Sequence, residues 1–220
     1  MSLGLLYLDE FKGYYQSKVI IILWIGLPII TLLLHFIPSN EEIPISSLAA
    51  LVVASVGGTI SSVMISTTIV SEMNQNVYVL FLVRPVKRAN LLIAKFLAVY
   101  TCLTIATVLS VTSGLIVDIF TKGMPQQVLL EDTFESITIS LAAMAIATSA
   151  GLLIGSNSKS IAVAAILSIY LGNQLSIISI LPGIFLSTWI NPILFSILIG
   201  LPTTIALLIV SMMLFNKKQF

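Results

Sequence analysis

The sequence is short of charge. Only 9% of its 220 residues are Asp, Glu, Lys or Arg, whereas 58% are hydrophobic, and the mean hydropathy is +1.11. A water-soluble domain of this length carries charge on roughly a quarter of its residues. The deficit excludes an ordinary soluble fold and predicts an all-α integral membrane protein, with one transmembrane domain over residues 1–220.

Cysteine and histidine are scarcer still. The chain has one cysteine, Cys102, and one histidine, His35. Disulfides, thiolate metal sites and metal sites built on histidine pairs are therefore not expected. The ten Lys and Arg residues form no cluster as large as a nucleic-acid groove requires. We expect no metal site, no cofactor and no nucleic-acid partner for this chain.

Residue constellations for catalysis and for ion-driven transport are also missing. Ser113 and His35 are the only conceivable serine–histidine pair, and His35 lies near the end of an apolar run, where an imidazole reaches headgroup water. No apolar run holds paired carboxylates. Asp118 and Lys95 are expected to reach water from the two ends of one run. The sequence therefore favours neither an enzyme nor a carrier driven by protons or sodium.

Long apolar runs are plentiful instead. A membrane-spanning helix needs about 20 mostly apolar residues. Before the first run, residues 1–18 mix apolar and charged side chains, which predicts a helix lying in the membrane interface. About six segments meet the length requirement for spans, at roughly 19–37, 48–70, 91–117, 136–155, 160–181 and 193–215.

The distribution of Lys and Arg predicts the orientation. With six spans, nine of these ten residues fall on one side and only Lys122 falls on the other. Loops that stay in the cytoplasm retain positive charge. We therefore expect a multi-pass protein of the cell membrane with both termini in the cytoplasm.

Small and uncharged polar residues recur within the spans. Ridges of small residues let helix backbones approach closely, and packing within one subunit is favoured over a seam between subunits. The ridges are Ala50, Ala54, Gly58 and Ser62 in one span and Ala143, Ala147, Gly151 and Gly155 in another. Polar residues more often bond to a neighbouring helix, but these are the candidates for lining a pathway: Thr101, Thr104, Asn173 and Gln174.

The cytoplasmic segment 71–90 is too polar to span a membrane and too apolar to be an idle linker. Glu72 to Val83 predicts a short amphipathic helix, which ends because Pro85 disfavours helical geometry at Arg84. A helix held at the interface by anionic lipid is the alternative reading of this segment.

Motif residues in and after this segment stand at characteristic offsets. They are Glu72, Phe81-Leu82, Pro85, Arg88 and Lys95, followed near the last span by Pro182, Trp189 and Asn191-Pro192. Together with the layout of spans, these residues resemble the permease subunit of ABC type-2 transporters. The chain departs from that pattern at Asn76-Val77, where the family has Gly-Thr, and at Ala94, where it has Gly.

The resemblance implies an ATP-driven exporter for a lipophilic or amphipathic substrate. Two permease copies, expected to form a homodimer in membrane lipid, would work with separate cytoplasmic ABC ATPase subunits that hold ATP and Mg. The chain has no Walker motif, the phosphate-binding loop of such ATPases. A membrane scaffold or assembly factor without transport activity, or an intramembrane enzyme, are the alternatives. The resemblance also implies that the amphipathic helix of segment 71–90 is a coupling helix, which docks on the ATPase. Its expected contact residues are Glu72, Asn76, Val77, Leu80, Phe81, Val83 and Arg84.

Overall fold

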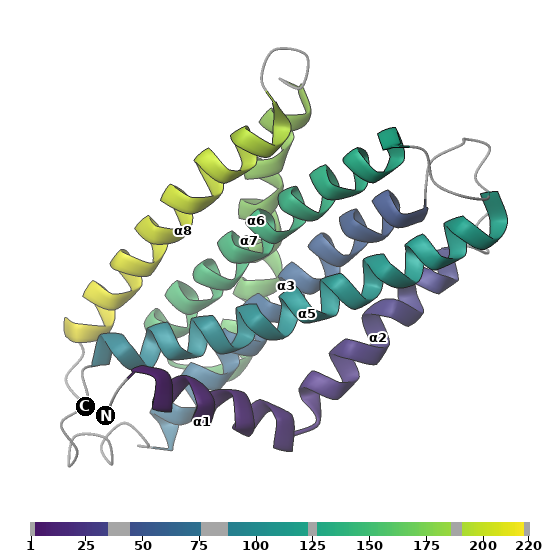
Figure 1. The fold of residues 1–220 in the computed structure, drawn as a ribbon. Coiled ribbons are helices and arrows are strands. Elements are labelled where there is room, and N and C mark those ends of the chain that lie inside the picture. The colour runs from purple at the N-terminus through teal and green to yellow at the C-terminus, as the bar shows by residue number, and fades with distance from the viewer. Residues whose placement is uncertain (1–2, 35–44, 76–87, 123–126, 186–190, 218–220) are drawn as a thin grey trace.

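The architecture is helical in every described part of the computed structural model. The structure describes residues 3–34, 45–75, 88–122, 127–185 and 191–217. These residues form seven helices and no strand, which confirms the all-α prediction (Figure 1). The helices are α1 (Leu3–Gln16), α2 (Val19–Leu34), α3 (Ile45–Asn74), α5 (Arg88–Lys122), α6 (Gln127–Asn157), α7 (Ile161–Phe185) and α8 (Pro192–Lys217).

Several helices have the length and composition of membrane spans. Four qualify individually: Val52–Asn74, Ala89–Thr121, Thr133–Asn157 and Pro192–Asn216. The pair α1 and α2 would make a fifth if it counted as one broken span, while the apolar stretch Ile161–Gly172 of α7 is shorter. A multi-pass membrane protein fits these helices.

The helices α3 and α6 form the most closely packed contact. A Cβ added to Gly151 would lie 2.5 Å from the carbonyl oxygen of Ser62, and one added to Gly155 would lie 2.8 Å from the Cα of Ser66. Only a residue without a side chain allows such an approach. The two predicted ridges of small residues therefore pack against each other within one chain, which confirms the intramolecular interpretation.

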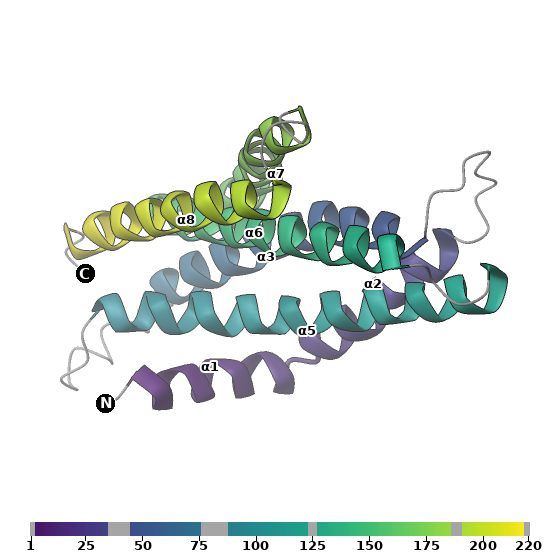
Figure 2. The same cartoon turned by 45° about the horizontal axis from the view of Figure 1, so that its top comes forward.

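The remaining helices surround this pair. α8 packs mainly on α6, α7 packs on α3 and α6, and α5 lies against α1, α2 and α3. In Figure 2, α5 and α1 lie on one side of α3 and α6, while α7 projects from the other side. Large apolar side chains remain exposed on α7 and α8, among them Ile166, Tyr170 and Leu198. Such faces suit contact with lipid or with another apolar helix.

An elbow separates α1 from α2. Lys18 adopts φ 62°, a left-handed conformation, and the two helices meet at 67°. The Ser17 amide donates to the Gly13 carbonyl at 3.0 Å, and the Ser17 hydroxyl donates to the Tyr14 carbonyl at 2.8 Å. These bonds satisfy carbonyl groups at the end of α1. Within the segment 1–18, residues 3–16 therefore form a helix of their own, and its predicted place in the membrane interface stays a prediction.

Candidate functional site

A cluster of three charged side chains joins α1, α3 and α5. The Lys95 ammonium of α5 donates to Glu10 Oε1 of α1 at 2.7 Å and to Glu72 Oε1 of α3 at 2.5 Å. The Lys95 side chain is 1% exposed, whereas the side chains of Glu10 and Glu72 are 20% and 23% exposed. An isolated buried ammonium is costly, so the two carboxylates are what allow Lys95 to lie there.

The three side chains of the cluster come from three different helices. Glu72 lies in the last turn of α3, Lys95 lies near the beginning of α5, and Glu10 faces them from α1. The cluster thus links the helix that leads into segment 76–87 with the helix that follows it. Figures 1 and 2 show the beginning of α5 and the end of α8 at the same end of the molecule as α1.

Two sequence expectations about charge are wrong. Lys95 was expected to reach water from a span end, but it is fully buried, because two carboxylates meet its ammonium inside the helix packing. Asp118 was expected to do the same at the other end of α5, and it is only 2% exposed. Charged residues in long apolar helices usually face the protein interior, and these two follow that rule.

Glu72 also differs from its predicted place. It was expected to begin a short helix running to Val83, where a carboxylate would favour the helix start. Instead, α3 continues unbroken to Asn74 and carries Glu72 in its last turn. In this last turn the Glu72 carboxylate meets the Lys95 ammonium of α5.

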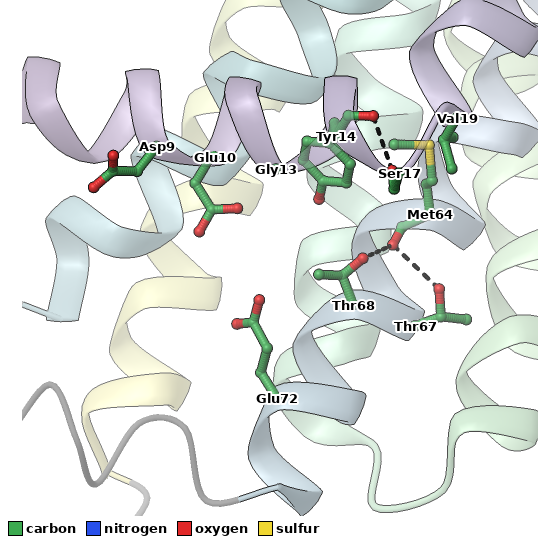
Figure 3. Close-up of a pocket in the computed structure, with 10 residues that line it drawn as sticks. All are labelled: Asp9, Glu10, Gly13, Tyr14, Ser17, Val19, Met64, Thr67, Thr68 and Glu72. Atoms are coloured by element: carbon green, nitrogen blue, oxygen red, sulfur yellow. Dashed lines mark hydrogen bonds between the residues drawn. The ribbon is translucent and has the colours of Figure 1, made fainter.

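An open pocket of about 550 Å³ lies beside the cluster, between α1, the beginning of α2, and α3. Figure 3 shows its carboxylates, Asp9 and Glu10 from α1 and Glu72 from α3. Burial raises the pKa of Glu10 above its ordinary value, and the opposing effect of Lys95 does not cancel it, since Glu72 and Asp9 act in the same direction as burial. Three carboxyl groups therefore line the pocket, and they raise one another's tendency to hold a proton.

Two further hydrogen bonds hold the elbow region against α5. The Tyr7 hydroxyl lies 3.0 Å from the Thr101 hydroxyl, which joins α1 to α5. The Trp24 indole donates to the Cys102 carbonyl at 3.1 Å, which joins α2 to the same part of α5. Together with the ion pairs, these contacts attach both arms of the elbow to one helix.

The described candidates for lining a pathway, Thr101, Thr104 and Gln174, do not form one group. Thr101 bonds to Tyr7, and Thr104 donates to the Thr101 carbonyl at 2.8 Å. Gln174 is exposed on α7, and the side chain of Asn173 lies outside the described part. The described parts of α5 and α7 make no contact with each other. The two threonines and Gln174 therefore lie on helices that do not touch within the described chain.

Most of the predicted ATPase contacts lie outside the described residues. This applies to Asn76, Val77, Leu80, Phe81, Val83 and Arg84, as it does to His35. Of that predicted set, the structure describes only Glu72. Sequence reasoning singled out Glu72 and Lys95 separately, but it missed Glu10 and Tyr14. Their signal was weak, because one acid and one tyrosine in an amphipathic helix are ordinary.

Comparison with known proteins does not add to the geometry. No family model matches this chain, and no curated protein matches it either. Among the described residues, no group of three or more His, Cys, Asp or Glu side chains is arranged to hold a metal ion.

Proposed function

We propose that this chain is the permease subunit of an ATP-driven ABC exporter, embedded in the cell membrane by six spans with both termini in the cytoplasm. The observation that carries the proposal is the pair Glu72–Lys95. It ties the end of α3 to the beginning of α5, the two helices between which the expected coupling segment lies. Because this ion pair joins the two helices that flank the segment, a push on the segment can move both helices together as a lever.

Motion of such a lever would reach the other helices through the same cluster. Glu10 connects α1 to Lys95, and the close packing of Gly151 against Ser62 connects α3 to α6. Closing of ATPase subunits would push on segment 76–87 and shift α1, α3, α5 and α6 together. Rigid elements with close contacts transmit displacement of this kind.

The substrate and the assembly follow from the same proposal. The exposed apolar faces of α7 and α8 suit a lipid environment or a second copy of the chain, and substrate would pass between the two copies. A lipophilic or amphipathic substrate fits apolar helices. ATP and Mg would be held by the separate ATPase, because the sequence contains no Walker motif.

Co-purification tests this function. Tagged protein isolated from its native membrane in mild detergent should carry a soluble subunit with a Walker motif, identifiable by mass spectrometry. The permease alone should show no ATP turnover, and the ATPase should change its hydrolysis rate when the permease is added. ATP hydrolysis by the isolated chain, or repeated purification without any ATPase, would favour the enzyme or the scaffold instead.

A further inference from the structure

The acidic pocket contains a buried hydroxyl, that of Tyr14. Tyr14 is 8% exposed and lines the pocket; Thr68 lies close enough to lower the pKa of its phenol, but the hydroxyl makes no hydrogen bond of normal geometry to a described residue. Figure 3 shows this hydroxyl pointing from α1 toward α3. Burial raises the pKa of Tyr14 to about 12, so the group is a neutral phenol at physiological pH. A buried polar group without a partner is costly, which indicates that a ligand or water completes it.

The other polar groups of the pocket are almost all acceptors. Thr67 donates its hydroxyl hydrogen to the Val63 carbonyl at 2.7 Å, and Thr68 donates to the Met64 carbonyl at 2.7 Å. Ser17 uses its hydrogen on the backbone in the same way. The oxygen lone pairs of these hydroxyls remain as acceptors, and ionised carboxylates only accept. A ligand for this lining must bring several donors.

Charge points to the same class of ligand. Asp9, Glu10 and Glu72 supply three carboxylates to the pocket, and Lys95 supplies one ammonium behind two of them. Three carboxyl groups and one ammonium make this part of the described lining net acidic. The aromatic ring of Tyr14 and the side chains of Met64 and Val19 add apolar wall, which suits the carbon atoms next to a cation.

We propose that this pocket binds a primary ammonium group, of the kind carried by the headgroup of phosphatidylethanolamine or by an alkylamine. Lys95 shows the chemistry within the chain itself, because a primary ammonium is held there at 2.7 Å and 2.5 Å by carboxylates of the same pocket. The volume of about 550 Å³ accommodates a lipid headgroup. Exposed apolar residues on the adjoining helices, Leu5, Leu8 and Ile22, offer a surface for the attached chain. The proposal does not depend on transport or on an ATPase.

Native mass spectrometry of the purified full-length chain in detergent provides the test. The probes are phosphatidylethanolamine and phosphatidylcholine with identical acyl chains. Phosphatidylcholine keeps the positive charge of the headgroup but has no N–H donor. Because the lining consists of acceptors, phosphatidylethanolamine should bind at least about tenfold more tightly.

Two variants and a matched control locate the site. Tyr14→Phe keeps the ring and removes the hydroxyl, and Asp9→Asn removes an exposed charge that lies outside the ion-pair cluster. Each should weaken binding of phosphatidylethanolamine by about fivefold or more. Tyr15→Phe, at a neighbouring exposed tyrosine that does not line the pocket, should leave binding unchanged.

Dodecylamine distinguishes the two sources of the ammonium. If dodecylamine displaces phosphatidylethanolamine, the pocket accepts amines in general; if it does not, the site recognises the lipid headgroup. Either result supports an ammonium site. Equal binding of the two lipids would overturn the proposal. Unchanged binding of phosphatidylethanolamine by both Tyr14→Phe and Asp9→Asn would also overturn it. If Tyr14→Phe does not give a monodisperse protein, the result for Asp9→Asn alone decides between the two outcomes.

Discussion

At Lys95 the protein places a full positive charge inside a helix that is apolar enough to cross a bilayer. Removing such a charge from water costs several kcal/mol, and only close partners compensate for it. Glu10 and Glu72 do so from two other helices. The need to compensate one buried charge therefore brings α1, α3 and α5 into contact.

Replacing Lys95 with Met should destabilise the protein by about 3 kcal/mol or more, because Glu10 and Glu72 would remain partly buried without their cation. Adding Glu10→Gln and Glu72→Gln to that variant should recover a substantial part of the loss. Denaturant unfolding in detergent micelles, followed by tryptophan fluorescence, measures both. A single variant as stable as the original protein would contradict the ion-pair account.

The close contact between helices α3 and α6 requires glycine at position 151. The backbone of α3 at Ser62 occupies the space where a Cβ on Gly151 would lie, and no rotamer change can clear a backbone atom. The cluster at Lys95 and this contact therefore hold α3 from two sides. A displacement of α3 should therefore move α5 through the ion pair and α6 through the close backbone contact.

Substituting Gly151→Ala should lower stability by about 2 kcal/mol or more, because α3 and α6 must separate to admit the methyl group. Gly26→Ala is the matched control, since a Cβ there would meet nothing within 4 Å. That change should be neutral or stabilising by up to about 1 kcal/mol, as expected for alanine in a helix. Equal thermal midpoints for the two variants would show that the close approach is not required.

Sequence reasoning predicts the helices well and their ends poorly. Apolar runs identify α2, α3, α5, α6, α7 and α8, because a long hydrophobic stretch must be buried in protein or lipid. Glu72, in the last turn of α3, pairs with Lys95 on another helix, and no local pattern encodes that contact. Glu10 lies 85 residues before Lys95, so their contact arises from tertiary packing. The pocket is therefore visible only in the folded chain.

For the whole molecule, the beginning of α5, the end of α8 and the N-terminal end of α1 lie at one end of the bundle (Figures 1 and 2). Arg88 begins α5 and Lys217 ends α8, and both helix ends lie at that same end, which the positive charges mark as cytoplasmic in the proposed topology (Figures 1 and 2). The opposite end should then face outward.

Single cysteines test this orientation in a background without Cys102. A cysteine at Glu42 or Pro125 should react with a membrane-impermeant thiol reagent in intact cells, whereas one at Lys87 should react only after lysis. The positive-inside distribution of nine residues against one is the reason for the expectation. Labelling at Lys87 from outside would rule out the six-span arrangement with cytoplasmic termini.

The most direct test of the central claim measures how strongly the permease binds its ATPase partner when the coupling segment is altered. Truncating an aromatic anchor at the centre of an interface costs about 2 kcal/mol or more, so Phe81→Ala should weaken the ATPase complex and uncouple ATP hydrolysis from transport, while the protein still reaches the membrane. Neutralising Lys87 and Arg88 together is the control and should leave the affinity for the ATPase close to that of the original protein. If Phe81→Ala left binding and transport unchanged while the Lys87 and Arg88 variant impaired them, the segment would be a lipid-bound interfacial helix and the lever account would be wrong.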